Sequence, residues 1–453
     1  MDSRIEHDSL GAVPVPRAAL WGAQTQRAIE NYPISGLRAA PALIRAYGLL
    51  KAALAEANGE AGRLPKTKAR AIARAAREVA EHRHDEQFPV DVFQAGAGVS
   101  FHMNVNEVIA HRASQLLGGR AVDANDDVNR GQSTNDTFPT ALRMALRFEL
   151  DDVSPAVEAC ARAFAAKGRE FRRVAKAGRT HLQDAVPVTL GAEFAAYGVT
   201  LRACGRELAH AADGLLELGL GGSAAGNGVN ASPQVTRSAI AKLRRATGRR
   251  WRSATDLCAA MQSQLPVAAA SAAMRNLALE LIRITNDLRL LSSGPRTGLA
   301  EIALPALQPG SSIMPGKVNP VMPEMLAMVC FQVVGNDTAT ALAMQAGQLE
   351  LNVMMPAMAC ATLQSAGILA RAVEAFTAKC VRGITADRKR CRAFAAGTMA
   401  LATSLTPAFG YARVAKLVQE ALRSGRPLLE LALELNRSEK RAPDAEIRRL
   451  LGL

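Results

Sequence analysis

The sequence predicts an all-α protein built around a bundle of long helices. Leucine and alanine are abundant, whereas runs that alternate β-branched and polar residues are scarce. Between residues 274 and 291, apolar side chains recur at spacings of three and four, as in a long bundle helix. With 453 residues, the chain is long enough for two or three domains with a large core.

Local signals place the borders of three long helices. The periodic series stops before Ser292-Ser293-Gly294-Pro295, which is a helix-ending signal. A second helix is expected to begin at Asp136, an N-cap candidate, with Pro139 tolerated near its start. Pro320 and Pro323 predict that the segment before them leads directly into a third helix. The apolar positions that define the first two helices are Met274, Leu277, Leu281, Ile284, Leu288 and Leu291, and Phe138, Ala141, Leu142 and Ala145, respectively.

The pattern divides the chain into three expected domains. Residues 1–133 would form a mixed, partly helical N-terminal domain, and residues 134–388 the central helical bundle domain. Residues 389–453 would form a small C-terminal helical domain.

Composition indicates a soluble, cytoplasmic protein. The seven cysteines are scattered without a C-x-x-C pair or a zinc-like cluster, which argues for a reduced compartment and against disulfides or a metal site. The first residues contain no apolar stretch of the kind found in signal peptides. Two uncharged runs, residues 257–274 and 351–370, contain proline, glutamine or asparagine and many alanines, so buried core helices are favoured over membrane spans.

The net charge of +14 raises the alternative of nucleic-acid binding. The basic residues are mostly arginines spread over alanine-rich segments, and only 4% of residues are aromatic and able to stack on bases. A solvated, arginine-rich surface is therefore favoured, and its positive field would attract a dicarboxylate. Nucleic-acid binding ranks as the third hypothesis and predicts steeply salt-dependent retention on DNA.

The segment 310–320, Gly-Ser-Ser-Ile-Met-Pro-Gly-Lys-Val-Asn-Pro, is suited to binding a small anion. It combines two hydroxyls (Ser311 and Ser312), the cation of Lys317 and the amide of Asn319. Its glycines allow backbone N–H groups to approach a ligand, and its prolines restrict the loop. Without a ligand, the same residues would be a capped loop with a solvated lysine.

Two further polar clusters are candidates for a binding site. Ser133, Thr134 and Asn135 are three adjacent hydrogen-bonding residues before a helix, and the alternative is an ordinary helix cap. Thr180 and His181 follow a turn-like Gly178-Arg179 pair, and the alternative is a structural histidine.

One glycine motif resembles a nucleotide-binding site only in its spacing. Gly219, Gly221 and Ala224 have the spacing of a dinucleotide-binding fingerprint, but they follow a helical pattern rather than a strand. A nucleotide site is therefore not expected there.

The segment 310–320 resembles the signature of the aspartase/fumarase superfamily, whose members eliminate an amine or an alcohol from a succinyl-type substrate to give fumarate. The similarity runs from Arg4 to near the C-terminus, and the other matching blocks appear in the family's order. These blocks are residues 104–108 (NVNEV), 132–136 (QSTND), 178–184 (GRTHLQD) and 286–296 (NDLRLLSSGPR).

The resemblance implies an all-α, three-domain subunit whose central long helices assemble into a homotetramer, with each active site drawn from three subunits. It implies a small dicarboxylate substrate, no organic cofactor, no metal, no nucleic acid and no membrane.

The resemblance also implies roles for the residues. Ser311 would be the general base, Ser312 would bind substrate, and Thr180, Lys317 and Asn319 would bind and stabilise one carboxylate. Ser133 and Thr134 would hold the other carboxylate, and Asn135 and His181 would face the leaving group, with Glu324 paired to that histidine.

The chain departs from the family pattern at three places. Val99 stands where the family usually has a threonine that binds substrate, and the neighbouring Ser100 is the expected replacement. Asp123 and Asp127 replace histidines of an accessory anion site, which is therefore not expected. Ser223 and Asn227 replace two threonines usual in the glycine-rich block of residues 219–230, which the family also has.

Two blocks resemble the aspartase branch, namely Val321-Met322-Pro323-Glu324 and residues 346–354. They predict an aspartate ammonia-lyase that reversibly converts L-aspartate to fumarate and ammonia. The alternatives are a sister lyase, such as a fumarate hydratase or a lyase for another substituted succinate, and a non-catalytic structural relative.

Overall fold

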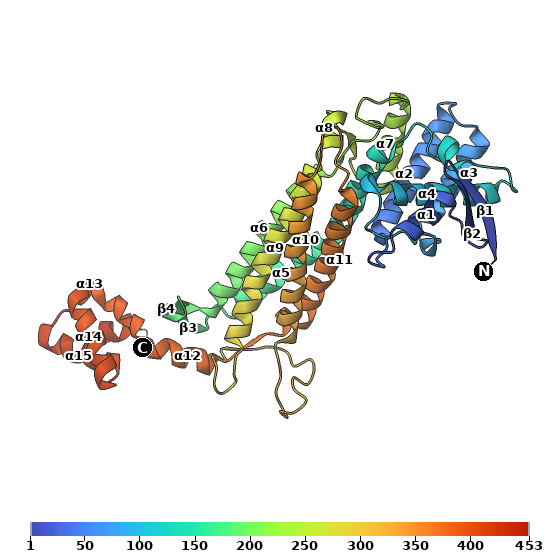
Figure 1. Ribbon diagram of the computed structural model, residues 1–453. Helices are drawn as coiled ribbons and strands as arrows, with labels where there is room; N and C mark the ends of the chain where they lie inside the picture. The colour runs from blue at the N-terminus through green and yellow to red at the C-terminus, as the bar shows by residue number, and fades with distance from the viewer. Residues whose placement is uncertain (1, 452–453) are drawn as a thin grey trace. The chain divides into compact units, whose positions relative to one another are not determined.

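The computed structural model describes residues 2–451 and is mostly helical, which confirms the predicted fold class (Figure 1). The chain separates into two compact units. Unit 1 comprises the residues up to 157 together with 203–281 and 328–372, and unit 2 comprises 158–202, 282–327 and the residues from 373 onward. The three-domain division remains a prediction.

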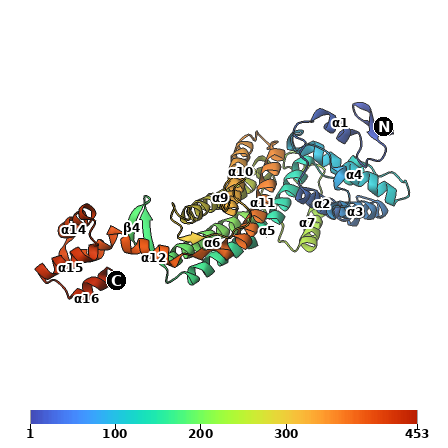
Figure 2. The ribbon, with the colours of Figure 1, turned by 90° about the horizontal axis from the view of Figure 1, so that it is seen from below.

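Five long helices each contribute residues to both units. Within each unit, their segments lie side by side as a bundle (Figures 1 and 2). The five helices are α5 (Thr134–Glu170), α6 (Leu190–Gly214), α9 (Leu265–Leu291), α10 (Val321–Gln345) and α11 (Met355–Lys379).

The periodic series between residues 274 and 291 lies in α9, and all six apolar positions are buried. The helix ends at Leu291, directly before the Ser-Ser-Gly-Pro signal. The four inner-face residues predicted for α5 are also buried. Both sequence predictions are confirmed. A spacing of three to four residues places apolar side chains on one face of a helix, and that face packs on the core.

The rest of unit 1 contains a strand hairpin, two further short strands and helices that are shorter than the five above. Strands β1 and β2 pair antiparallel, from Ser3 opposite Pro16 to Asp8 opposite Gly11. The other elements are α1 (Ala23–Asn31), α2 (Pro41–Glu60), α3 (Lys66–Ala80), α4 (Val99–Leu116), β5 (Glu217–Leu218), α7 (Pro233–Thr247), β6 (Arg252–Ser253) and α8 (Leu257–Gln262). Strands β1 and β2 span Ser3–Asp8 and Gly11–Pro16.

Unit 2 contains a second hairpin and a C-terminal group of helices. Strands β3 (Ala175–Thr180) and β4 (Gln183–Thr189) pair antiparallel, with a register shift at Ala177 and Gly178. The other elements are β7 (Ile302–Ala303), β8 (Thr385–Ala386), α12 (Arg388–Gly397), α13 (Thr406–Phe409), α14 (Tyr411–Ser424), α15 (Leu428–Glu439) and α16 (Asp444–Leu450). The C-terminal helices have a core of their own, which includes Leu405, Phe409, Ala432 and Ile447.

Helices α9 and α10 are long and apolar enough to cross a membrane by length and composition alone. In each, less than half of the most apolar 18-residue stretch is buried within the chain. Core helices of soluble proteins pass the same test, so two such helices are weak grounds for a membrane span. Of the two uncharged runs that were expected to be buried core helices, residues 257–274 cover α8 and the start of α9, and residues 351–370 lie in α11 and directly before it.

We predict that Gly48→Ala destabilises unit 1. A Cβ at Gly48 of α2 would lie 2.5 Å from Ala80 N and 2.6 Å from Ala76 O of α3, and backbone atoms cannot move aside as side chains can. Such overpacking typically costs about 1–3 kcal/mol of unfolding free energy. The measurement is the midpoint of urea unfolding. Gly205→Ala is the matched control in a helix, because its nearest neighbour is Val157 Cγ1 at 3.8 Å. Equal midpoints for both variants would contradict the packing.

Candidate active site

The signature segment 310–320 is an exposed loop in unit 2 that is closed by its own hydrogen bonds. Gly310 N donates to Lys317 O at 2.8 Å, and Asn319 Nδ2 donates to Gly310 O at 2.8 Å. A Cβ at Gly310 would lie 2.6 Å from Lys317 O, so only glycine allows this closure. Asn319 therefore has a structural task in addition to the substrate binding predicted for it, and one N–H of its amide stays available.

Ser311 is held in a setting that favours negative charge on its oxygen. Its Oγ accepts hydrogen bonds from Ile313 N at 3.2 Å and Met314 N at 3.0 Å. Preorganised N–H donors of this kind stabilise an oxyanion. Ser312 and Lys317 are both exposed on the same loop. The loop therefore combines a serine oxygen that two N–H groups can stabilise as an alkoxide with a cation that can meet an anion.

Helix α10 begins at Val321, directly after the loop, which confirms the predicted helix start. Its first turn contains Glu324, which is partly exposed and whose N–H donates to Pro320 O at 3.1 Å. Because unpaired N–H groups concentrate at a helix start, this end of α10 adds positive potential beside the loop.

Thr180 and His181 lie at the tip of the β3–β4 hairpin, and both are exposed. Thr180 pairs with Gln183 across the turn, and the two residues between them, His181 and Leu182, have φ of 55° and 59°. Positive φ at both central positions is typical of the two-residue type I′ turn, which usually contains asparagine and glycine. Two larger residues in this strained conformation indicate a functional constraint on the tip.

Buried ion pairs fix the base of this hairpin. Glu301 is fully buried, and its Oε2 lies 2.8 Å from Arg179 Nη1 and 3.5 Å from Lys176 Nζ. Lys176 Nζ also lies 2.9 Å from Glu193 Oε2 at the start of α6. Two cations share the Glu301 carboxylate, so its charge is compensated in spite of burial. Strand β3, which ends at Thr180, is therefore anchored, although the hairpin tip is exposed.

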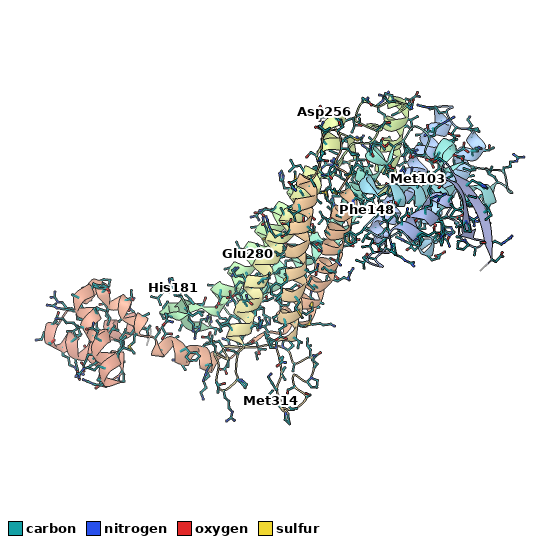
Figure 3. All side chains as sticks on the ribbon, in the orientation of Figure 1. Met103, Phe148, His181, Asp256, Glu280 and Met314 are labelled. Atoms are coloured by element: carbon teal, nitrogen blue, oxygen red, sulfur yellow. The ribbon has the colours of Figure 1, made fainter. Side chains whose placement is uncertain are left out.

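Unit 2 by itself does not bring the hairpin tip and the signature loop together. Figure 3 labels His181 on the hairpin and Met314 on the loop at separate positions. Within the described residues of unit 2, no hydrogen bond or ion pair joins the two. The pairing of His181 with Glu324 thus remains a prediction.

Unit 1 contains Ser133, Thr134 and Asn135 at the start of α5. The helix begins at Thr134, so the prediction that Asp136 is the N-cap was wrong. Ser133 takes the capping position: its Oγ accepts from Asn135 N at 3.2 Å, and Asp136 Oδ1 accepts from Ser133 N at 3.0 Å. This reciprocal pair is a capping box, in which the helix starts one residue after its serine.

The Asp136 carboxylate also binds the glycine-rich block. It is buried, and its Oδ2 accepts from Gly221 N at 3.0 Å and Ser223 N at 3.2 Å. Asn135 Nδ2 donates to Ala224 O of the same block at 2.8 Å. Burial raises the pKa of Asp136 to about 6, against the opposing effect of these hydrogen bonds. The block therefore serves to hold residues 133–135 in place.

The segment with the unusual Val99 lies at the start of α4. Gly98, with φ of 85°, precedes this helix, and a Cβ there would lie 2.1 Å from the ring of Phe138 in α5. This close approach seats α4 against α5. Val99 is exposed and Ser100 is buried. The role of Ser100 as the replacement hydroxyl remains a prediction.

Two residues beside Thr134 were not predicted from the sequence. His102 Nδ1 lies 2.6 Å from Thr134 Oγ1, and Lys51 Nζ lies 2.9 Å from His102 Nε2. Burial lowers the pKa of Lys51 to about 7, and burial together with the Lys51 charge lowers the pKa of His102 well below its usual value. The available signal was a lone lysine within the apolar run of residues 47–54.

Comparisons with known proteins agree with the motifs. A sequence model described as a lyase matches residues 11–335. The class II fumarate hydratase of Corynebacterium efficiens is 45% identical over 95% of this chain and 91% of its own length. The aspartate ammonia-lyase of Pseudomonas aeruginosa is 44% identical over 95% of this chain and 93% of its own length. A solved class II fumarase from Schistosoma mansoni has a TM-score of 0.96 at 35% identity and covers 99% of this chain and 98% of its own.

We predict that Gly310→Ala lowers turnover at least about tenfold without unfolding the protein. The added methyl group would push apart the Gly310–Lys317 closure that positions Ser311. A displacement of about 1 Å at a reacting group is enough for such a loss. The measurements are steady-state kinetics and the thermal midpoint. Gly205→Ala again provides the control, and a variant with normal turnover would contradict the structural role of Gly310.

Proposed function

This chain belongs to the aspartase/fumarase superfamily of lyases, and on that premise we propose that it is a fumarate hydratase that interconverts L-malate and fumarate. The class II fumarate hydratase of Corynebacterium efficiens and other relatives at 43–45% identity with the same name support this choice. The aspartate ammonia-lyase predicted from the signature region becomes the second candidate.

The observation that carries the proposed chemistry is the pair of backbone N–H groups on Ser311 Oγ. Elimination requires a base to remove a weakly acidic proton from the carbon beside a carboxylate. A serine hydroxyl is a poor base at neutral pH, but its alkoxide is stabilised where N–H donors are already aimed at the oxygen. Ser311 takes the proton, the C–O bond to the hydroxyl breaks, and the leaving oxygen is protonated to give water and fumarate.

Charge builds up on the carboxylate next to the carbon that loses its proton. Lys317 and the free N–H of Asn319 meet this carboxylate from the signature loop, assisted by Ser312. Thr180 supplies a hydroxyl from the hairpin tip. Cations and donors that are fixed before the reaction lower the energy of such a transition state more than that of the substrate.

The remaining residues hold the rest of the diacid. Ser133 and Thr134 donate to the second carboxylate from the start of α5. Ser100 supplies a further hydroxyl and lies two residues before His102, the hydrogen-bond partner of Thr134. Asn135 and His181 face the leaving group, and Glu324 tunes the charge of His181. Clamping both ends of a four-carbon diacid places its reacting carbon at Ser311.

The second candidate is aspartate ammonia-lyase, which the block Val321-Met322-Pro323-Glu324 favours. Pseudomonas aeruginosa aspartate ammonia-lyase matches this chain at 44% identity, close to the values for the hydratases. The same residues would act in both reactions, because each begins with removal of a proton beside a carboxylate. The two functions differ in the group that leaves.

We also propose a cytoplasmic homotetramer with shared active sites. Thr134 belongs to unit 1, whereas Ser311 and His181 belong to unit 2, and the last two are apart within that unit. Helix α10 exposes Met328, Phe331 and Leu342, and apolar side chains of this size are usually covered by a partner. Copies of the chain that pack along α10 would cover them.

We predict that Ser311→Ala abolishes fumarate formation, while the protein still binds succinate, a diacid with no leaving group. The variant lacks the base but keeps Lys317 and Thr134. The assay follows the ultraviolet absorbance of fumarate with L-malate and L-aspartate offered in parallel, and calorimetry follows succinate. Wild-type turnover of L-malate alone supports the hydratase, and turnover of L-aspartate alone selects the second candidate. Full activity of Ser311→Ala would contradict the assigned base.

We predict that Ser311→Ala, which is inactive, and Thr134→Val, which binds substrate weakly, regain wild-type activity in some sites when they are co-expressed. If a site takes Ser311 and Thr134 from different subunits, mixed tetramers of Ser311→Ala and Thr134→Val contain some intact sites, about a quarter of the total on random mixing. The matched control pairs Ser311→Ala with Lys317→Met, since both residues lie on one loop and no intact site can form. Equal activity in both mixtures would refute shared sites.

A further inference from the structure

Lys51 is a buried cation that lies against hydrogen-bonding groups, and within residues 2–451 no carboxylate is in salt-bridge contact with it. It is 1% exposed, on α2. Its Nζ lies 2.7 Å from Gln132 Oε1, 3.2 Å from Asn129 Oδ1 and 2.9 Å from His102 Nε2. A charged group buried without a paired carboxylate destabilises a fold, so its presence calls for a reason beyond stability.

The charge of Lys51 decides which nitrogen of His102 carries the proton. An ammonium group has three donors and no lone pair, so the nitrogen that faces it must be the acceptor. His102 Nε2 faces Lys51, and Asn106 Nδ2 lies 3.2 Å from the same nitrogen. The pKa of His102 is well below its usual value because of burial and the Lys51 charge, so the ring is neutral. Its single proton therefore resides on Nδ1.

The position of that proton sets the direction of the Thr134 hydroxyl. His102 Nδ1 lies 2.6 Å from Thr134 Oγ1, so the Nδ1–H donates and Thr134 accepts. A hydroxyl has one O–H, and that O–H is then free to point away from His102. Thr134 is 9% exposed whereas His102 is 1% exposed, so of these two side chains it is the one that can meet a ligand.

We propose that Lys51 is a positioning residue that, through His102, reserves the O–H of Thr134 for a carboxylate of the diacid substrate. The inference rests on the proposed function, because Thr134 binds substrate only there. A carboxylate can only accept hydrogen bonds, so it needs Thr134 as a donor. With the proton on His102 Nε2 instead, the Thr134 O–H would turn to Nδ1, and the carboxylate would face an oxygen lone pair.

The groups around Lys51 make this arrangement depend on pH. Besides His102 of α4 and the two amides of residues 129 and 132, the buried Asp136 of α5 attracts the charge. On the neighbouring helices α3 and α7, the charged residues Arg77 and Lys242 form ion pairs with Glu56 of α2. Because burial lowers the pKa of Lys51 to about 7, the ammonium is lost as the pH rises through that value. The bias on His102 is lost with it.

Neutron diffraction on crystals of the unmutated, deuterium-exchanged protein below pH 7 tests the hydrogen-bond chain directly. We expect deuterium on His102 Nδ1, none on Nε2, and a Thr134 O–D directed away from the imidazole. Deuterium on Nε2 and not on Nδ1 would overturn the proposal. The measurement needs no variant and no turnover, so it decides the chain of bonds even if the protein converts neither L-malate nor L-aspartate, which would refute the proposed function alone.

A double-mutant cycle tests the link to binding. Lys51→Met is expected to raise KM about tenfold or more, the usual loss for a missing partner of a buried polar group, with kcat changed little. In the Thr134→Val background, the same substitution should change KM less than about twofold, because its effect passes through Thr134. Equal changes in KM in both backgrounds would show a merely structural role and overturn the proposal.

Two further variants complete the test. Arg143→Met removes another buried cation of unit 1, one that donates to the backbone carbonyls of Glu217 and Ser263, and it should leave KM unchanged. In the wild type, KM should rise as the pH passes 7, whereas Lys51→Arg keeps a permanent cation and should flatten that rise. A KM that rises identically in wild type and Lys51→Arg would count against Lys51.

Discussion

The buried carboxylate of Asp136 is the constraint on which the candidate site residues of unit 1 depend. A carboxylate is costly to bury, and here three backbone N–H groups, from Ser133, Gly221 and Ser223, compensate it. Its place in the first turn of α5 adds the favourable helix dipole. Because one group satisfies donors from two segments far apart in sequence, the start of α5 and the glycine-rich block are fixed to each other. Thr134 is therefore presented by rigid backbone.

In both units, a fully buried charged side chain lies behind the residues of the candidate site. In unit 1, Lys51 and His102 stand behind Thr134. In unit 2, Glu301 holds Arg179, which precedes the hairpin tip with Thr180 and His181. Electrostatic interactions are stronger where water is excluded, so such groups orient their neighbours firmly. The residues proposed to contact the substrate are thus distinct from the buried residues that hold them in position.

The signature loop achieves its shape without burial. The side chains of residues 310–320 are exposed or partly exposed, and the Gly310–Lys317 and Gly310–Asn319 hydrogen bonds close the loop. Exposure leaves Ser311 and Lys317 accessible, as the proposed sharing of each site between subunits requires. Helix α10, which follows the loop, exposes apolar residues that the proposed subunit contacts would cover.

The sequence by itself determined the helical class, the α9 periodicity with its end at Leu291, and the start of α10 after the loop, because these depend on spacing and on residues that break helices. The motif residues of the candidate site were also visible, since their order and composition carry the resemblance. Only the tertiary structure decided that Ser133 rather than Asp136 caps α5, and that Lys51 and His102 stand behind Thr134. The physical reason is that a hydrogen bond between residues 51, 102 and 134 depends on how helices pack, and helix packing brings together positions that no local pattern connects.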